Sequence, residues 1–408
     1  MNIWYLNHYA AVPGYGKFLR SQHLAARWQQ AGHRCTVFPA RYHHLLNAPL
    51  SERACIDGVE YQPLPAREYS GNGFQRLLNI IDYCRAIPSL KHRSDEFGAP
   101  QAIILSSAPP MGIFATHRLA RHFNAKLVFE IRDLWPLSIT EIAGKSRLHP
   151  LTAISEISER YGYKHANLCA SLLGNAEDFM RQHGLRGSFV YVPNGYEPQS
   201  VKEPASPLGK TVYQRIRQWQ QEGRKVIIHP GAQGIPNALD VLINACRKLS
   251  CTDVDSKFAV VLLGEGTETS NLKELAKDLP NIAFFPSIPK EEAFYVTAAC
   301  DIGYSGARDH RKVYQYGISF NKIVDFMGAG LPVIVPFFTR GDPVSLSGCG
   351  VVTDSDAPED VARAITRMVG YSDQERQEIG RKGKQYADTQ LSYASIAERY
   401  IRAIEDAV

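Results

Sequence analysis

The stretch KVIIHPGAQGIPNALDVLINACRKL (Lys225–Leu249) shows how this chain is built. It begins with a short apolar run, passes through a loop containing glycine and proline, and continues with apolar residues at helical spacing. That order predicts a buried strand followed by a helix. Because the same order recurs along the chain, we expect an α/β fold with doubly wound parallel sheets.

The first half of the chain contains a series of such apolar runs, each followed by a polar or proline-containing loop. A helix is expected from about Phe18 to Ala31, directly after the first run. The runs are NIWYLN (2–7), GHRCTVFPA (32–40), AIILSSAPP (102–110), KLVFEIRDLWP (126–136), NLCASL (167–172) and SFVYVPNG (188–195).

The polar segment YEPQSVKEPASPLGK, with its three prolines, interrupts this pattern and predicts a linker near 196–208. A length of 408 residues also favours two domains over one core. We therefore predict Rossmann-like domains at 1–196 and 208–390, with a C-terminal helix at about 391–408 that packs back on the first domain. The later strands are expected in KFAVVLLGEG (257–266), IAFFPSI (282–288), CDIGYSG (300–306), LPVIVPF (331–337) and GCGVVT (348–353).

The composition, 44% hydrophobic and 21% charged, is that of a soluble globular protein. The eight cysteines are scattered without a C-x-x-C pair, which predicts reduced thiols in a cytoplasmic protein. The N-terminus lacks the long apolar region of a signal peptide, and no run of about 18 apolar residues could span a membrane.

The charge is distributed unevenly. Residues 1–190 contain 21 Lys and Arg against 14 Asp and Glu, a net charge of +7, whereas the remainder has 25 against 27, a net charge of −2. A basic first half favours an anionic partner, such as a phosphate-bearing substrate or an acidic membrane surface. The alternative is an uneven solvated surface.

The stretch YGISFNKIVDFMGAGLPVIV (316–335) carries the clearest functional pattern. A helix beginning near Ser319–Asn321 presents free N–H groups that suit a phosphate, and Lys322 adds a positive charge in its first turn. Asp325, one turn in, could accept hydrogen bonds from a ribose. The alternative is a purely structural helix with Ser319 as its cap and Asp325 as a favourable first-turn charge.

Landmarks along nearly the whole chain resemble the retaining GT-B glycosyltransferases of group 1 (family 4), and in detail the bacterial L-fucosamine transferase branch of O-antigen and capsule synthesis. These landmarks are NIWYLNHYAAVPGYGKFLR, GHRCTVFPA, FEIRDLWP, VPNGYEP, VVLLGEG, PKEEAFYVTAACDIGYSG and YGISFNKIVDFMGAGLPVI. The resemblance implies two facing Rossmann-like domains with an interdomain cleft, the first for the acceptor and the second for the donor.

The resemblance also implies an activity: retaining transfer of a sugar, such as an N-acetylated amino sugar, from a UDP-sugar to a hydroxyl of a lipid-linked or polysaccharide acceptor. No metal or other cofactor is implied, because helix dipoles and a cation stabilise the departing diphosphate in this fold. The incomplete glycine pattern of GEGTE argues against a dehydrogenase. Two rival classes remain: a hydrolysing UDP-sugar 2-epimerase-like enzyme and a non-catalytic nucleotide-sugar binding protein.

For the donor, the resemblance assigns Asp325 to the nucleotide ribose, and Ser319, Asn321 and Lys322 to the diphosphate. The family's usual first acid falls on Gly317, so the sugar-contacting glutamate is absent. The family's two cations at the start of the second domain are missing as well, and in their place this chain has Ala232 and Asn237. Lys322 is the best candidate to replace those cations, and Arg308, Arg311 and Lys312, just upstream, are secondary candidates.

Three loop residues complete the predicted donor site. Gly16, in VPGYGK (12–17), would bring backbone close to the diphosphate. Gly264 and Ile288 follow strands and are expected to make backbone contacts, the second near the base. For Gly16 the alternative is a simple turn from strand to helix.

Arg132 and Asp133 end a buried strand in FEIRDLWP and are the predicted catalytic or acceptor-contacting residues. Asp133 would accept the proton of the acceptor hydroxyl, although a structural Arg132–Asp133 pair is the alternative. His8 is a further candidate for this site. Arg20 could contact an acceptor phosphate or be solvated.

Residues 69–93 carry apolar side chains at helical spacing between basic flanks (Phe74, Leu77, Leu78, Ile81 and Cys84). Such a helix could lie on an acidic bilayer or in the core of the first domain. Together with the basic first half, it favours a polyprenyl-diphosphate-linked acceptor at the inner face of the bacterial cytoplasmic membrane, with the protein bound peripherally. No nucleic acid partner is expected.

Overall fold

A computed structural model of the chain describes residues 1–16, 19–50, 53–71, 73–197 and 203–407. The chain divides into two compact units, each built around a sheet. Unit 1 comprises Met1–Gly195 together with Tyr393–Val408, and unit 2 comprises Tyr196–Ser392. The division after Gly195 falls at the start of the segment that the prolines mark as a linker.

In unit 1 the described residues form an eight-stranded sheet with the order β3-β4-β2-β1-β5-β6-β7-β8. All neighbouring strands are parallel except the β3–β4 pair. Its strands are β1 (Asn2–Asn7), β2 (Arg34–Phe38), β3 (Ala54–Ile56), β4 (Val59–Tyr61), β5 (Ala102–Ser106), β6 (Lys126–Ile131), β7 (Leu168–Ser171) and β8 (Ser188–Tyr191).

The hairpin β3–β4 was not predicted from the sequence. It turns at Asp57 and Gly58, whose φ angles are +51° and +78°. An Asp-Gly pair with both φ angles positive is typical of a tight β-hairpin turn, so the signal was present in the sequence. The flanking strands were not predicted because each is only three residues long, too short to show a strand periodicity.

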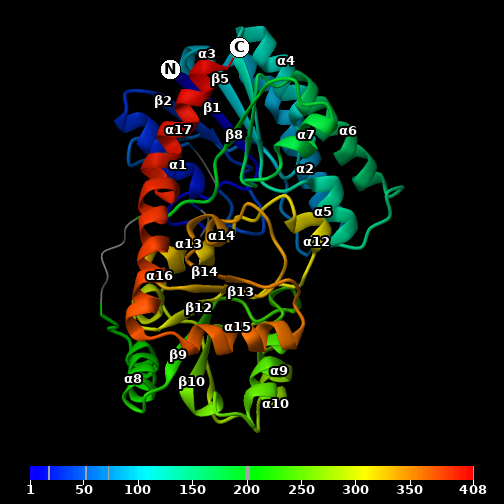
Figure 1. The fold of residues 1–408 in the computed structure, drawn as a ribbon. Coiled ribbons are helices and arrows are strands. Elements are labelled where there is room, and N and C mark those ends of the chain that lie inside the picture. Colours follow the sequence, from blue (N-terminus) through cyan, green and yellow to red (C-terminus); the bar gives the residue numbers. More distant parts are fainter. Residues whose placement is uncertain (17–18, 51–52, 72, 198–202, 408) are drawn as a thin grey trace. The chain divides into compact units, whose positions relative to one another are not determined.

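The described helices of unit 1 cover both faces of its sheet: α1 (Arg20–Gln30), α2 (Phe74–Ala86), the 3₁₀ helix η1 (Ile87–His92), α3 (Ser94–Phe97), α4 (Ile113–Phe123), α5 (Trp135–Glu141), α6 (Pro150–His165), α7 (Glu177–Gln182) and α17 (Tyr393–Asp406). Although α17 is the last helix of the chain, it lies beside α1 (Figure 1). The Trp28 indole donates to the Ala397 carbonyl at 3.0 Å, and its ring packs edge-on against Tyr400.

Helix α2 exists as the sequence predicted, but it buries a different face. Asn79, Ile80 and Tyr83 point into unit 1, whereas Phe74 remains 71% exposed. The other apolar residues of the predicted face are only partly buried. Across the described part of the chain, no helix combines the length and apolar character needed to cross a bilayer.

Unit 2 contains a six-stranded, all-parallel sheet among its described residues, with the order β11-β10-β9-β12-β13-β14. Its strands are β9 (Lys225–Pro230), β10 (Phe258–Leu263), β11 (Ile282–Phe285), β12 (Ile302–Tyr304), β13 (Val333–Val335) and β14 (Gly350–Val352). Each lies within a segment that the sequence predicted as a strand. The order reverses between β9 and β12, and ligands of such sheets bind beyond the carboxyl ends of the strands at this switch point.

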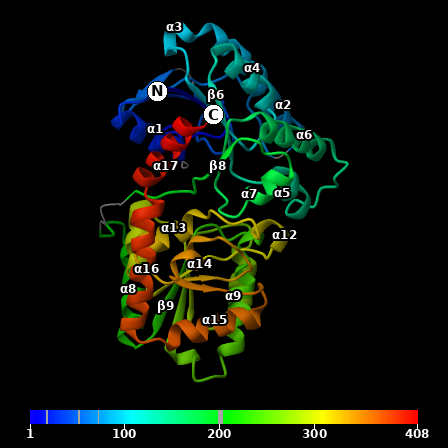
Figure 2. The ribbon, with the colours of Figure 1, turned by 45° about the horizontal axis from the view of Figure 1, so that its top comes forward.

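Two apolar cores sandwich the sheet of unit 2. Helices α8, α11, α13 and α14 contribute to one core, and α9, α10 and α15 to the other; α8 and α9 lie on opposite sides of β9 (Figure 2). The described helices are α8 (Pro207–Gln221), η2 (Ile235–Asn237), α9 (Leu239–Leu249), η3 (Asp255–Lys257), α10 (Thr269–Leu275), α11 (Lys290–Ala298), α12 (Arg311–Tyr314), α13 (Asn321–Gly328), α14 (Pro343–Ser347), α15 (Pro358–Gly370), α16 (Asp373–Tyr386) and the π-helical turn η4 (Ala387–Leu391).

Candidate functional site

The N-terminus of α13 lies at the carboxyl edge of the unit 2 sheet. Its N-cap residue is Phe320, in extended backbone, and no described side chain caps the helix. The structural alternative in which Ser319 serves as the cap is therefore wrong. Uncapped N–H groups at a helix start remain available to an anion.

Lys322 extends from this helix start to the loop that follows β9. Its Nζ atom lies 3.0 Å from His229 Nε2 and 3.4 Å from Asn237 Oδ1. It also lies close to Gly231, since a Cβ atom built on that glycine would be 3.7 Å from Nζ. The ammonium therefore lies against the loop in which the resemblance predicts two cations that this chain lacks.

Burial controls the protonation of this cluster. It lowers the pKa of Lys322 to about 7, so that near neutral pH the amine gains or loses its proton easily. Burial and the neighbouring Lys322 hold the pKa of His229 well below its usual value, so the imidazole is neutral. A neutral ring beside the amine avoids a second positive charge in the cluster.

Asp325 follows Lys322 by three residues on the same helix. Its side chain is partly buried, and no partner for the carboxylate occurs among the described residues. Burial raises its pKa, while the positive charge of Lys290 acts in the opposite direction. A partly buried carboxylate without a partner has its acceptor capacity free for hydroxyl groups.

Gly264 and Ile288 lie on the neighbouring loops. Gly264 has a φ angle of +136°, and a Cβ atom there would lie 2.1 Å from the Gly231 carbonyl oxygen. The contact between two loop backbones therefore accounts for this glycine without a ligand. Ile288 is partly buried against the core that contains α13.

Gly317 marks the position of the missing glutamate. Its φ angle is +107°, a conformation that L-amino acids rarely adopt. Hence the loss of the carboxylate is accompanied by a backbone that favours glycine, and a simple Gly317→Glu replacement would be strained.

In unit 1, Arg132 and Asp133 directly follow β6, at the carboxyl edge of the sheet. The Arg132 backbone N–H donates to Ser107 Oγ at 3.3 Å. The predicted alternative of an Arg132–Asp133 ion pair is not formed among the described residues. Asp133 is exposed, so water reaches its carboxylate, although the surrounding protein disfavours the charged form and raises its pKa.

Glu159 supports this loop from α6 and was missed in the sequence. Its carboxylate accepts a hydrogen bond from the Trp135 backbone N–H at 2.9 Å and one from the Tyr163 hydroxyl at 3.1 Å. Burial raises its pKa to about 8, so the group holds a proton near neutral pH. Nothing in the local sequence of α6 distinguishes this glutamate from a solvated one.

His8 is buried, with 1% of its surface exposed. Asn79 Nδ2 donates to the carbonyls of Tyr42 and Arg67, so its Oδ1 atom accepts the proton on His8 Nε2 at 2.8 Å. Burial lowers the pKa of His8 to about 3. A direct catalytic role for His8 stays a prediction, and it would require the ring to become accessible.

Arg20 is neither solvated nor exposed to an acceptor. It forms a buried ion pair with Glu130 at 3.2 Å and donates to the Val192 carbonyl at 2.7 Å. Glu130 also accepts from the hydroxyls of Tyr5 and Ser106. These contacts tie α1 to β6 and to the end of β8, which is a structural role.

The loop that holds Gly16 is closely packed. A Cβ atom on Gly16 would lie 2.8 Å from Ala11 Cβ and 2.9 Å from the Leu45 carbonyl oxygen. Close packing within unit 1 therefore explains why residue 16 is a glycine. Lys17, the last residue of the predicted loop 12–17, lies outside the described residues.

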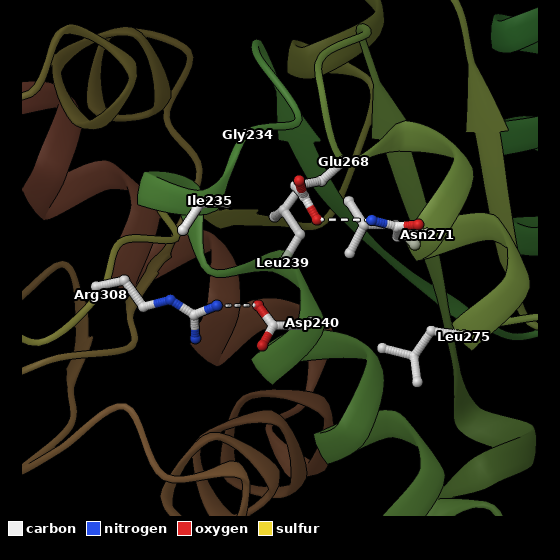
Figure 3. A pocket seen from close by; sticks show the side chains of 9 residues that line it. Gly234, Ile235, Leu239, Asp240, Glu268, Asn271, Leu275 and Arg308 are labelled. Carbon is white, nitrogen blue, oxygen red and sulfur yellow. Dashed lines mark hydrogen bonds and ion pairs between the residues drawn. The ribbon is translucent and has the colours of Figure 1, made fainter.

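A cavity of about 170 Å³ lies on the other side of the β9–α9 loop, between this loop and α10 (Figure 3). Arg308 and Asp240 pair across it at 2.7 Å, and Asn271 donates to Glu268. Lys322, His229 and Asn237 do not line it, and Arg308, the secondary cation candidate that does, is paired with Asp240. It is therefore separate from the cluster around Lys322.

Comparison with known proteins finds a family similarity in the first unit. Residues 19–195 match the family model described as a glycosyl transferase 4-like domain. No curated protein sequence matches the chain.

Solved structures resemble the chain over its full length. Sucrose-phosphate synthase from Thermosynechococcus elongatus has a TM-score of 0.73 and 14% identity, covering 99% of this chain and 98% of that one. HepE from Anabaena, solved with UDP and glucose, has a TM-score of 0.64 and 14% identity, covering 99% of both. WaaG, a glycosyltransferase involved in lipopolysaccharide biosynthesis, has a TM-score of 0.62 and 15% identity, covering 99% and 100%. These likenesses, with the two parallel sheets, establish the GT-B fold.

Proposed function

We propose that this chain is a retaining glycosyltransferase that moves a sugar, such as an N-acetylated amino sugar, from a UDP-sugar to a hydroxyl of a lipid-linked or polysaccharide acceptor. The glycosyl transferase 4-like domain and the GT-B fold support the reaction type. HepE, which shares the fold, was solved with UDP. The observation that carries the proposal is the placement of Lys322 against the loop after β9, one turn before the unpartnered carboxylate of Asp325.

In this proposal the N-terminus of α13, with Ser319 and Asn321, and the ammonium of Lys322 hold the donor diphosphate. Asp325 accepts hydrogen bonds from the ribose hydroxyls. As the bond to the sugar breaks, negative charge grows on the departing diphosphate, and a fixed cation with a helix N-terminus stabilises it without a metal. Because Gly317 offers no carboxylate to the sugar, donor affinity rests mainly on the nucleotide.

Arg132 and Asp133 are proposed to contact the acceptor or the transferred sugar. Both follow β6 at the carboxyl edge of the unit 1 sheet, where ligands of this type of sheet bind. With retention, the acceptor attacks on the face from which the diphosphate leaves, and the leaving oxygen itself takes the proton. Such a step needs no carboxylate nucleophile. Asp133 is therefore proposed to contact the acceptor or the sugar without forming a covalent bond to either.

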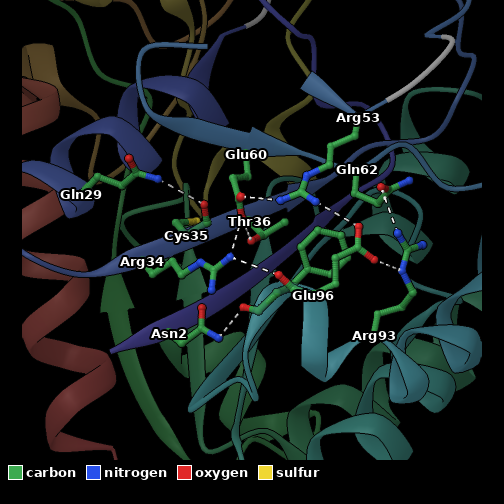
Figure 4. Close-up of polar contacts among 11 residues, drawn as sticks. Asn2, Gln29, Arg34, Cys35, Thr36, Arg53, Glu60, Gln62, Arg93 and Glu96 are labelled. Carbon is green, nitrogen blue, oxygen red and sulfur yellow. Dashed lines mark hydrogen bonds and ion pairs between the residues drawn. The ribbon is translucent and has the colours of Figure 1, made fainter. Parts of the chain in front are cut away.

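Some of the positive charge of unit 1 is neutralised within the protein. Arg53 pairs with both Glu60 and Glu96, and Arg34 and Arg93 join the same network (Figure 4). These arginines are therefore weak candidates for an acidic partner.

The segment formed by the loop between α5 and α6 and the first half of α6 is better suited to a membrane. Leu148 is 91% exposed and Ile157 57% exposed. Lys145 and Arg147 precede them and have no ion-pair partner among the described residues. Apolar side chains flanked by free cations fit an anionic bilayer, and we propose this segment as the surface that brings the enzyme to a polyprenyl-diphosphate-linked acceptor at the cytoplasmic face of a bacterial membrane.

Calorimetric titration with UDP tests the donor site. Lys322→Met should weaken UDP binding by roughly 1–3 kcal/mol, since it removes a charge-assisted hydrogen bond, and Asp325→Asn should weaken it less. Lys273→Met, which removes an exposed lysine on α10, is the matched control and should bind as the wild type does.

Unchanged affinity in Lys322→Met would refute the donor-site assignment. Turnover assays then separate the rival classes. Release of UDP from a UDP-sugar without any acceptor would favour a hydrolysing epimerase-like enzyme. Binding of UDP-sugar without turnover in the presence of every acceptor tested would favour a binding protein.

A further inference from the structure

His229 lies at the carboxyl end of β9, beside the switch point of the unit 2 sheet, and none of its surface is exposed. Its Nδ1 atom is 3.0 Å from the Tyr304 carbonyl oxygen at the end of β12. A carbonyl oxygen can only accept, so Nδ1 must carry the ring proton. In the neutral ring the Nε2 atom then bears a lone pair.

That lone pair faces Lys322. The distance of 3.0 Å between Nε2 and Nζ is a hydrogen bond in which the lysine donates. The other polar contact of Nζ among the described residues is the weaker one with Asn237 Oδ1, at 3.4 Å. A lysine side chain is a flexible stem with a compact charge, so one strong buried acceptor largely decides where the charge rests.

We propose that His229 is a positioning residue for the donor site: its Nδ1–H tautomer, held by the Tyr304 carbonyl, presents Nε2 as the acceptor that places the Lys322 amine at Gly231. This inference rests on the proposed function, because it assumes that Lys322 binds the diphosphate of the donor. It adds a residue that has no charge and makes no contact with the ligand itself.

The arrangement explains how one lysine on α13 can serve the loop after β9. The lysine comes from the far side of the switch point, and without an acceptor in β9 its amine would sample many rotamers. Of the three ammonium protons, one goes to His229 and one to Asn237, so the third remains for the diphosphate. A protonated His229 would remove the acceptor and place a second charge at 3.0 Å, but burial and the neighbouring Lys322 hold the pKa of His229 well below its usual value, so Nε2 stays free to accept.

A double-mutant cycle with UDP calorimetry tests the proposal. His229→Leu should weaken UDP binding about tenfold, because Lys322 loses its fixed position while the cavity stays filled. His229→Gln, whose amide oxygen can accept near the position of Nε2, should recover most of the affinity. The combined variant His229→Leu/Lys322→Met should bind no more weakly than Lys322→Met alone, because His229 acts only through the lysine.

Asn281→Leu provides the control for the loss of a buried polar group. Asn281 is 2% exposed and lies at the opposite edge of the same sheet, so its replacement should leave UDP affinity unchanged. Thermal unfolding identifies any variant that fails to fold. If His229→Leu does not fold, the UDP affinity of His229→Gln tests the proposal. Wild-type affinity in folded His229→Leu, losses that add in the double variant, or no recovery with glutamine would overturn the inference. A wild-type protein that binds no UDP would instead overturn the proposed function.

Discussion

At the scale of single residues, the chemistry of the candidate site depends on how burial changes protonation. Lys322 is an ordinary lysine in the sequence, yet burial brings its pKa to about 7 in the folded protein. Glu159 changes in the opposite sense, since burial raises its pKa to about 8. Both shifts come from withdrawing the charged form from water, which the sequence around each residue does not reveal.

The lowered pKa of Lys322 predicts a pH-dependent affinity for UDP. Above pH 7 the free protein holds mostly the neutral amine, whereas a bound diphosphate favours the ammonium, so binding takes up a proton. Affinity should therefore fall as pH rises from 7 to 9, approaching about tenfold per pH unit. The terminal phosphate of UDP titrates near pH 6, so it contributes little to the slope in this window.

Calorimetry at several pH values measures this slope. Lys322→Met should bind weakly with a flat profile between pH 7 and 9, because it lacks the titrating amine. Equal slopes in the wild type and this variant would show that another group titrates.

At the scale of elements, the loops after parallel strands decide where ligands bind. The loops after β9 and β10 pack backbone to backbone at Gly231 and Gly264, which fixes the rim beside Lys322. Helix α2 shows the converse: its apolar pattern predicted the helix, but not which face would be buried. The periodicity defines a stripe on a helix, and only its neighbours decide what that stripe contacts.

The α5–α6 segment provides the element-scale prediction. Replacing Leu148 and Ile157 with serine should reduce binding to vesicles containing anionic lipid about a hundredfold or more, because each apolar side chain that becomes buried contributes roughly 1.5–3 kcal/mol. Cosedimentation with anionic and with purely zwitterionic vesicles measures the effect. Leu346→Ser, at a leucine 57% exposed in unit 2, is the control and should bind as the wild type does. Equal binding by the double-serine variant and the control would exclude this surface.

At the scale of the whole molecule, the chain's last helix completes its first unit. Residues Tyr393–Asp406 belong to the unit that begins at Met1, and the core of that unit includes Ile396, Tyr400 and Ile404. The contact between α1 and α17 therefore joins residues far apart in the sequence, such as Trp28 and Ala397, which are 369 positions apart. Unit 1 cannot complete this core before the end of the chain is available.

Tyr400→Ala tests this closure. Removing a fully buried aromatic side chain should destabilise unit 1 by about 3–5 kcal/mol. Hydrogen-exchange mass spectrometry should show lost protection in α1, β7 and α17, while peptides from β9 to β13 keep theirs. An even loss of protection in both units would mean that they unfold as one.

Much of the fold could be predicted from the sequence, because strands and helices follow from periodicities of two and 3.6 residues. The predicted strands were confirmed, and the GT-B fold with them. The hairpin at Asp57-Gly58 was missed because its strands are too short to show a period. The residues of the candidate site were harder to predict than the strands. The spacing of Lys322 and Asp325 pointed to both of them, whereas no sequence pattern pointed to His229 or Glu159.

The sequence by itself determined the α/β architecture and the helix start that carries Lys322 and Asp325, since both depend on residues that are neighbours along the chain. Only the tertiary structure decided that Lys322 meets His229, 93 residues earlier, that Arg20 is consumed by a buried ion pair with Glu130, and that His8 lies inside unit 1. The physical reason is that hydrogen bonds and desolvation depend on which atoms meet in space. The folded sheet brings the ends of distant strands to one edge, and no local pattern states which side chains will meet there.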